Sequence, residues 1–316
     1  MTLHVIVGKG PIGATTAEQL LEDGGEVRVL SRSGAPGHDD PRSFAEVHHV
    51  AVDATDAEAL SRACAGADVV YNCVNPPYHR WATDWPPVAH ALLTAAEAHD
   101  AVLVTAANLY VYGPVRGTMT ERTPLASTDT KGRVRAAMWE QARARHEAGR
   151  LRATEVRASD YLGPRALVTS HVGERLLAPV LAGKTVRPVG DVDQPHSWTY
   201  LPDLARALVA AGRTEAAWGS PWHAPSPSPR TYRELAESVA QAAGVGSPRI
   251  SPLPMWAVGA LGIVNPMMRE IHRIGYQFTE PFVMDSTESE RVLGVAPTGW
   301  DDIVSTTLAW WRSTGR

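Results

Sequence analysis

The sequence predicts an α/β fold, a Rossmann-type doubly wound parallel sheet with helices on both faces and a smaller C-terminal lobe. In the first half of the 316-residue chain, short apolar runs alternate with helical stretches, as in βαβ units. A glycine triplet at GxGxxG spacing follows the first apolar run. Beyond residue 165 the alternation loosens. We therefore expect a first domain at 1–165 and a second lobe at 166–316, with 195–215 returning to the first domain.

The expected elements follow in order along the chain. In the first domain, strands are expected at 5–7, 26–30, 47–52, 68–74, 101–106 and 153–157. Four helices are expected there: one that begins near residue 14, one at 56–65, one that ends at about residue 99 and one at 131–149. In the second lobe, strands are expected near 185–189, 197–201 and 221–224, and helices near 167–182, 202–212, 231–244 and 298–312.

Composition excludes several functional classes. The chain is 44% hydrophobic and 20% charged, with a net charge of −4, which argues against nucleic acid as a main partner. No apolar run nears the length that spans a bilayer, so we expect no membrane contact. Cys64 and Cys73 are too few for a disulfide framework and lack metal-ligand spacing. We expect a cytoplasmic protein that binds no metal and acts on a small molecule.

The glycine triplet is typical of a turn that cradles a dinucleotide pyrophosphate. Gly8 allows the tight turn, Gly10 lets the backbone approach the phosphates, and Gly13 lets the following helix pack on its strand. The helix N-terminus offers free N–H groups to the anion, and Pro11 stands where a missing N–H costs little. The alternative is a purely structural turn. The residues assigned to the cofactor here are Gly8, Lys9, Gly10, Pro11, Ile12 and Gly13.

The residues after the second strand favour NADP(H), with NAD(H) as the alternative. A carboxylate there would bind the ribose 2′-hydroxyl of NAD, but this chain has Ser31 and Arg32. A hydroxyl and a guanidinium suit a phosphate, and Lys9 adds a second cation. The alternative is a solvated turn arginine. Asp53, after the third strand, is placed to bind an adenine edge; alternatively, Asp53 or Thr55 caps the next helix.

Several motifs together resemble a known family, the extended short-chain dehydrogenases/reductases of the NAD-dependent epimerase/dehydratase type. They are the GxGxxG turn, Asp53, Tyr112-Gly113, the segment Arg157–Pro164 and the segment Thr199–Asp203. The resemblance implies a Rossmann domain, a C-terminal substrate lobe and a nicotinamide that faces the cleft between them. It also leaves a homodimer open, because members often dimerise through a helix bundle. Asn75, Ser159 and Asp160 are assigned to the cofactor.

The chain departs from this family at its proton-transfer residues. Asn108 stands where the family carries Ser or Thr, and Lys131 and Arg135 replace the tyrosine and lysine of Tyr-x-x-x-Lys. In the family the tyrosine exchanges a proton with the substrate, while the lysine lowers its pKa and holds the ribose. Arg135 could bind ribose but cannot be a base. Lys131 could be an acid or base only if burial or neighbouring cations lower its pKa.

Other residues could supply the missing proton. Tyr110 could point into the cleft as a donor, and Asp160 and Tyr161 stand where the family contacts nicotinamide and substrate. Asn108 could instead orient a carbonyl and leave proton delivery to water. The alternative for Tyr110 and Tyr112 is packing in a half-buried extended segment.

The loop after the fourth strand is the other candidate for substrate contact. Tyr78 and Trp81, with Trp85, could wall an apolar pocket, because ligands of open α/β sheets bind outside the carboxyl ends of strands. The alternative is that Trp81 and Trp85 pack as an i, i+4 pair. His196 would come from the closing lobe, as would Tyr161.

The leading hypothesis is an NADP(H)-dependent oxidoreductase that transfers hydride to C=O, C=N or C=C of a small, partly apolar metabolite. The assigned catalytic residues are Asn108, Tyr110, Lys131 and Arg135. One alternative is a redox-neutral epimerase or dehydratase-like enzyme that retains its cofactor. The other is a non-catalytic NADP-binding sensor or scaffold.

Overall fold

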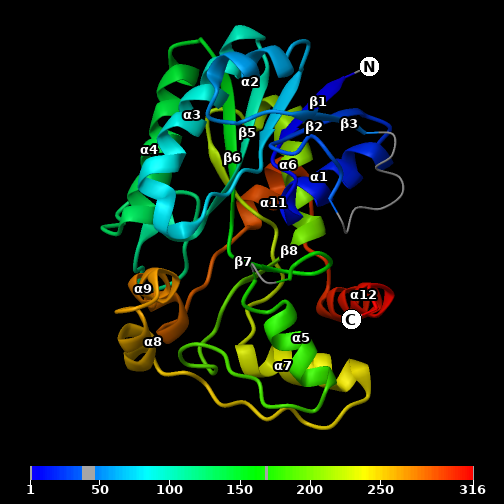
Figure 1. Ribbon diagram of the computed structural model, residues 1–316, viewed down its shortest axis with the longest axis vertical. Helices are drawn as coiled ribbons and strands as arrows, with labels where there is room; N and C mark the ends of the chain where they lie inside the picture. Colours follow the sequence, from blue (N-terminus) through cyan, green and yellow to red (C-terminus); the bar gives the residue numbers. More distant parts are fainter. Residues whose placement is uncertain (1, 38–46, 168–169, 316) are drawn as a thin grey trace.

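A parallel sheet forms the centre of the first domain, which confirms the predicted fold class. The computed structural model describes residues 2–37, 47–167 and 170–315, and within them seven strands lie in the order β3-β2-β1-β4-β5-β6-β9 (Figure 1). Because β1 pairs with both β2 and β4, the strand order reverses beside it, where open α/β sheets bind ligands. The strands are β1 (Leu3–Val7), β2 (Glu26–Ser31), β3 (His48–Ala51), β4 (Val69–Asn72), β5 (Val102–Asn108), β6 (Arg152–Ala158) and β9 (Pro221–His223).

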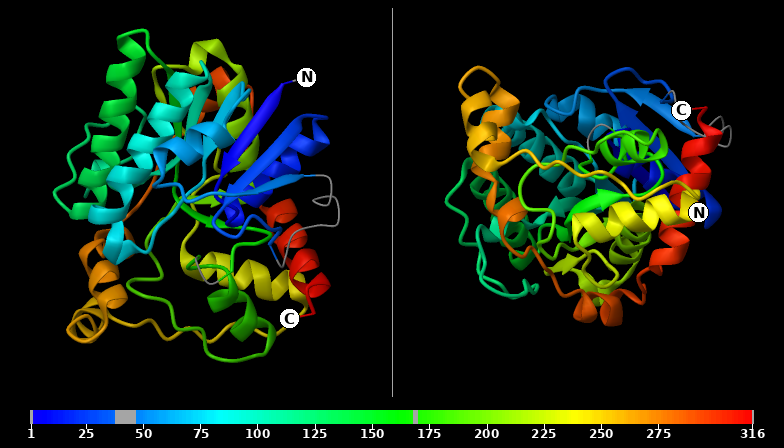
Figure 2. Two further views of the ribbon diagram at one scale, coloured as in Figure 1. Left: turned by 45° about the horizontal axis from the view of Figure 1, so that its top comes forward. Right: turned by 90° about the horizontal axis from the view of Figure 1, so that it is seen from below.

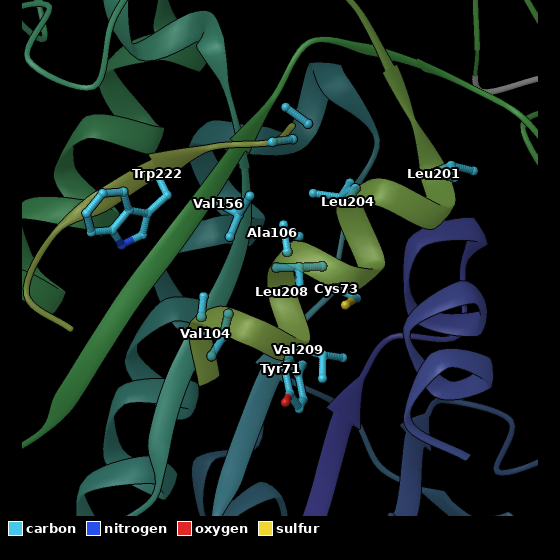
Figure 3. Close-up of a cluster of buried hydrophobic side chains, with 14 of the residues drawn as sticks. Tyr71, Cys73, Val104, Ala106, Val156, Leu201, Leu204, Leu208, Val209 and Trp222 are labelled. Atoms are coloured by element: carbon cyan, nitrogen blue, oxygen red, sulfur yellow. The ribbon is translucent and has the colours of Figure 1, made fainter. Parts of the chain in front are cut away.

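One layer of helices covers each face of the sheet, so the central strands are buried on both faces. All five residues of β1 are buried, as expected for a parallel strand between helix layers. On one face, Leu204 and Leu208 of α6 lie against Val104 and Val156 of the sheet (Figure 3). The helices on that face are α1 (Pro11–Glu22), α6 (Leu201–Arg213) and α11 (Thr287–Leu293). The helices on the other face are α2 (Ala57–Ala63), α3 (Trp81–Ala98) and α4 (Thr130–Glu147).

The second lobe lies below the carboxyl ends of the strands in Figure 1. Its main cluster packs α5 (Glu174–Leu181), α7 (Tyr232–Ala243) and α12 (Trp300–Ser313) around a parallel pair, β7 (Asp160–Leu162) and β8 (Trp198–Tyr200). Three short helices, α8 (Met255–Leu261), α9 (Pro266–Arg273) and α10 (Tyr276–Thr279), lead back to the first domain. Single-turn helices are η2 (Tyr78–Arg80), η3 (Leu109–Tyr112) and η4 (Glu215–Ala217).

The chain beyond residue 165 differs from the sequence prediction in three places. The strand expected near 221–224 forms as β9, but it pairs with β6 in the sheet of the first domain. The strand expected near 185–189 is wrong: Val186 and Val189 make only isolated bridges, to Ile250 and Leu253. The helix expected over 167–182 begins only at Glu174, and residues 168–169 lie outside the described part. Gly173 precedes it in a bend so tight that a Cβ there would lie 1.9 Å from the Ala166 carbonyl oxygen. Within the described ranges, no helix has the length and apolar character needed to cross a membrane.

Candidate functional site

The glycine turn before α1, which we call the glycine cradle, is closely packed at Gly8 and Gly13 and open at Gly10. A Cβ at Gly8 would lie 2.7 Å from the Cys73 carbonyl oxygen, and one at Gly13 would lie 1.9 Å from the Gly8 carbonyl oxygen. Gly8 also has a φ of +108°, which disfavours other residues. A Cβ at Gly10, the N-cap of α1, would meet nothing within 4 Å. Two glycines therefore allow close packing and the third faces open space, which fits a pyrophosphate approaching the helix N-terminus.

The loop after β2 places the predicted NADP residues beside this cradle. Lys9 Nζ donates to Ser33 Oγ at 2.9 Å and to the Ala35 carbonyl oxygen at 2.9 Å, so Lys9 fastens the loop to the glycine turn. Arg32 is exposed on that loop, and Ser31 Oγ accepts a hydrogen bond from the Gly34 backbone. Within the described residues 31–37 of this loop, the cation presented to solvent is Arg32.

Asp53 does not cap α2. Its Oδ1 accepts hydrogen bonds from the Thr55 backbone N–H and hydroxyl, and these bonds, followed by the Arg32 guanidinium, hold the pKa of Asp53 below its usual value. The helix cap is Asp56, which accepts from the Ala59 N–H, so the predicted capping role of Asp53 or Thr55 is wrong. The exposed Asp53 carboxylate stays a predicted adenine contact.

Lys131, which we predict from the sequence to stand in place of the tyrosine of Tyr-x-x-x-Lys, is bound by Glu270 of α9. Its side chain is 1% exposed, and Nζ donates to Glu270 Oε2 at 2.7 Å and to the Glu270 carbonyl oxygen at 3.3 Å. The partner was not foreseen, because nothing in the local sequence around Glu270 indicates a residue 139 positions away. The ion pair joins the first domain to the second lobe.

Arg135, one turn along α4, is also enclosed by protein groups. Its guanidinium carbon lies 4.3 Å from the Trp85 ring centroid and 4.9 Å from that of Trp81, and Nη1 donates to the Ala106 carbonyl oxygen at 3.4 Å. Burial lowers the pKa of Arg135 to about 10. Trp81 and Trp85 are buried and meet edge to face with ring centroids 6.1 Å apart, so they do pack as an i, i+4 pair. Both rings also stabilise the arginine through cation–π contacts.

The two phenols of Tyr78 and Tyr110 meet at the carboxyl ends of β4 and β5. Their oxygens lie 2.9 Å apart, and burial raises the pKa of Tyr78 to about 12 and that of Tyr110 well above its usual value. The expected extended segment is wrong: Asn108 Oδ1 accepts from the Tyr110 N–H at 3.3 Å and turns the chain into η3. Because burial raises the pKa of both phenols, both hydroxyls stay protonated near neutral pH.

Tyr112, two residues further along η3, belongs to a different buried network. Its hydroxyl lies 2.7 Å from His223 Nε2 and accepts from Arg157 Nη1 at 2.8 Å. His223 Nδ1 lies 2.7 Å from the Asp285 carbonyl oxygen, which can only accept, so Nδ1 carries the proton and the Tyr112 hydroxyl donates to Nε2. Tyr112 thus connects β5 to β6 and β9, apart from the Tyr78–Tyr110 pair.

A carboxylate–imidazole cluster lies at the start of β7. Asp160 Oδ2 lies 3.1 Å from His196 Nε2, and Oδ1 lies 4.0 Å from His171 Nε2. Burial alone would raise the pKa of Asp160, but the two imidazoles outweigh it and hold the pKa below its usual value. Burial raises the pKa of both Tyr78 and Tyr110, and the nearby negative charge of Asp160 raises both further.

The remaining predicted residues lie around this cluster or at the strand ends. Ser159 is buried and its N–H donates to Thr199 Oγ1, while Tyr161 is half-buried on β7. Asn75 is exposed in the loop after β4. Sequence reasoning missed Gln277 of α10, which is 2% exposed and lies beside the Tyr110 hydroxyl. Among residues 2–37, 47–167 and 170–315, no three His, Cys, Asp or Glu side chains form a group that could hold a metal.

Comparison with known proteins gives one family and a common fold. The sequence model of the NAD dependent epimerase/dehydratase family matches residues 5–221. No curated protein sequence matches the chain significantly.

Among solved structures, the fold is similar to a UDP-glucose 4-epimerase from Thermotoga maritima with UDP-glucose, at 18% identity and a TM-score of 0.81 over 100% of both chains. It is also similar to a dTDP-glucose 4,6-dehydratase from Bacillus anthracis in complex with NAD, at 16% identity and a TM-score of 0.82 over 99% of this chain and 97% of that chain. A UDP-glucuronic acid 4-epimerase from Bacillus cereus in complex with NAD gives 16% identity and a TM-score of 0.81 over 100% of both chains. At these identities the likeness shows the fold.

Proposed function

The chain belongs to the NAD-dependent epimerase/dehydratase family, and we propose that it acts as an NADP(H)-dependent reductase of a small, partly apolar metabolite with a C=O, C=N or C=C bond. When bound, the cofactor supplies the hydride. The observation that carries the proposal is the glycine cradle, in which Gly10 alone leaves room for a ligand at the N-terminus of α1. This is the geometry that a dinucleotide pyrophosphate requires.

The preference for NADP(H) rests on the charges at the end of β2. Arg32 is exposed there, and Lys9 fastens the same loop through Ser33. No carboxylate occupies the position that would bind a ribose 2′-hydroxyl. A guanidinium forms charge-assisted, bidentate contacts with a phosphate, so Arg32 is the proposed partner of the 2′-phosphate.

The reductive direction follows from the protonation of the phenols. Oxidation of an alcohol needs a base near neutral pH, whereas burial keeps both Tyr78 and Tyr110 protonated. We assign proton donation to Tyr110, whose hydroxyl would give its proton to the oxygen of a bound carbonyl substrate. The half-buried Tyr78, 2.9 Å away, returns a proton to Tyr110 and recovers one from water. Asn108 holds this geometry by fixing the Tyr110 backbone.

The other assigned residues keep their proposed roles around this donor. Arg135, positioned by the two tryptophans, is the proposed contact to the nicotinamide ribose. Asn75, Ser159 and Asp160 are further proposed cofactor contacts. The proposed substrate contacts are Tyr78, Trp81, Tyr161 and His196.

Two specific observations favour other functions. The family and its NAD-bound structural neighbours favour a redox-neutral epimerase or dehydratase that regenerates its cofactor. The engagement of Lys131 by Glu270 and of Arg135 by two tryptophans favours a non-catalytic NADP-binding protein. Cofactor that copurifies and is never consumed would indicate the first, and nucleotide affinity without turnover on a carbonyl panel would indicate the second.

The test is nucleotide binding with two matched glycine variants. Gly10 and Gly299 are both helix N-caps with a φ of −68° and with no atom within 4 Å of an added Cβ. Alanine is therefore tolerated at both, at a similar cost of about 1 kcal/mol or less for the weaker cap. Only Gly10→Ala places a methyl group where the pyrophosphate would approach the backbone.

By calorimetry, we expect NADPH to bind the wild type and Gly299→Ala alike, and NADH to bind more weakly. A hydrogen bond to a charged group contributes ~1.5–3 kcal/mol, so loss of one in Gly10→Ala lowers the affinity for NADPH about 10- to 150-fold. Binding of neither nucleotide to the wild type would overturn the proposal. If Gly10→Ala and Gly299→Ala bind NADPH with equal affinity, the nucleotide does not bind at the glycine cradle.

A further inference from the structure

The large apolar side chains that are exposed gather on one short segment of the second lobe. In the part of the chain that the structure describes, all of them lie on or between α8 and α9. Trp256 is 76% exposed, and Ile263 and Val264, in the connection between the helices, are each 82% exposed. Leu261 and Met267 complete the group, which we call the α8–α9 patch. Isolated exposed apolar residues need no explanation, but a contiguous patch marks an interaction surface.

The opposite side of the hairpin is anchored in the protein. Glu270 binds Lys131 of α4, and Ile271 is 5% exposed against the hydrophobic cluster around Val258 and Phe278. Helices α8 and α9 pack against each other and project from one edge of the molecule, shown in orange in Figures 1 and 2. The patch is therefore a fixed outward face.

The charges around the patch are positive, although the whole chain carries −4. Arg269 and Arg273 are exposed on α9, and η2, which packs against α9, adds Arg80. Within 251–274 the single acidic residue is Glu270, which is buried and bound to Lys131 and Arg273. Asp84, the nearby acid on α3, is paired with Arg80.

We propose that the α8–α9 patch docks the protein on the surface of an anionic lipid bilayer, with Trp256, Ile263 and Val264 entering the headgroup region. Arg269 and Arg273 then contact lipid phosphates at its edge. An apolar tip with tryptophan and flanking arginines is the composition of interfacial segments, and anionic lipids attract such cations. Helices of seven and eight residues are too short to span, so the attachment is to one leaflet surface. The proposal departs from the expectation of no membrane contact, which rested only on the lack of a spanning apolar run.

The same charges argue against a second copy of this chain as the occupant. In a two-fold symmetric contact through the patch, Arg269 of one copy would approach Arg269 of the other, and the nearest carboxylate, Glu270, is already bound to Lys131 and Arg273. The inference does not depend on the proposed reductase activity, since none of the patch residues belongs to that site.

The test is co-sedimentation of the protein with vesicles of phosphatidylcholine alone and of phosphatidylcholine mixed with phosphatidylglycerol. We expect binding to the mixed vesicles that is about 30-fold stronger than to phosphatidylcholine, from two arginines near the anionic surface. Ile263→Ser/Val264→Ser should weaken it about 100-fold, because the two side chains no longer leave water. Both positions are solvent-exposed, so the fold should survive, and circular dichroism checks this.

Charge variants provide an independent arm. Arg269→Gln should weaken binding to the mixed vesicles several-fold, whereas Arg312→Gln, an exposed arginine on α12, should leave it unchanged. Absence of wild-type binding to the mixed vesicles overturns the proposal, as does unchanged binding of the serine double variant. A third outcome also overturns the proposal: light scattering shows that the wild type is a dimer and the serine double variant a monomer, and the wild type does not bind vesicles. The patch would then be the contact with a second copy of the chain.

Discussion

The buried ion pair between Lys131 and Glu270 provides a quantitative test of what occupies the family's tyrosine position. Glu270→Gln removes the negative charge but keeps the shape of the side chain. The side chains are 1% and 7% exposed, and Glu270 is the only carboxylate paired with Lys131 in the described part of the chain. The variant therefore leaves an ammonium group inside the protein without a counter-charge.

The expected cost is large and unequal for the two partners. Breaking a buried pair from one side costs ~3–5 kcal/mol of unfolding free energy, because the remaining charge stays desolvated. Lys131→Met should cost less, since Glu270 keeps Arg273, whose Nη1 lies 2.8 Å from Oε1 and whose side chain is half-exposed. The double variant Lys131→Met/Glu270→Gln should be more stable than Glu270→Gln alone.

Urea unfolding followed by both circular dichroism and tryptophan fluorescence measures these differences, and coincident curves check the two-state assumption. The matched control is Glu58→Gln, which breaks the exposed pair with Arg62 on α2 and should cost ~0.5 kcal/mol or less. A cost below ~1 kcal/mol for Glu270→Gln would place the pair in the range of exposed pairs and refute the reasoning. A larger cost for Lys131→Met than for Glu270→Gln would refute the predicted asymmetry.

Three further predictions concern pH, proton donation and cofactor choice. Burial lowers the pKa of His4 from 6.5 to about 4, so neutral His4 contributes to the free energy of unfolding above pH 6.5, and this contribution is lost as the pH falls towards 4. Urea unfolding should show a loss of about 3 kcal/mol over this pH window, and His4→Asn should not show it. Once a substrate is found, Tyr110→Phe should lower turnover ~100-fold or more at unchanged NADPH affinity, whereas Tyr112→Phe should keep turnover and lose stability; equal rates would remove Tyr110 as donor. In calorimetry, Arg32→Gln should weaken NADPH about 10- to 150-fold and leave NADH unchanged, and an equal loss for both would contradict a 2′-phosphate contact.

The elements of the first domain could be predicted because their signals are local. Strand β1 contains the β-branched run Val5–Val7, which ends at Gly8, and the glycine spacing indicates both the turn and the helix behind it. In the second lobe the signals are weaker. Near 185–189 only Val186 and Val189 are aliphatic, with Arg187 and Pro188 between them, and only isolated bridges to Ile250 and Leu253 form there.

The composition of the site could be predicted only in part, because its contacts join residues far apart in the sequence. The departure at Lys131 is visible in the sequence, but Glu270 lies 139 residues later on a helix with no catalytic motif. The approach of Tyr78 to Tyr110 depends on the single turn that Asn108 caps, and a tyrosine–valine alternation indicates an extended segment instead. A residue's type gives its chemistry, whereas its partner is set by the packing of the two lobes.

These contacts give a physical reason why cofactor binding and proton transfer separate in this chain. The cradle at Gly10 depends on backbone geometry alone, so it is unaffected by the exchanges on α4. Lys131 is bound to Glu270, and Arg135 is held by two tryptophans. The Arg135 charge lowers the pKa of Tyr78, but burial outweighs it and the pKa stays raised, at about 12. The phenols that remain, at Tyr78 and Tyr110, are kept protonated by burial and suit donation rather than abstraction. These protonated phenols therefore support the proposed reductive direction over a cycle that must first oxidise the bound substrate.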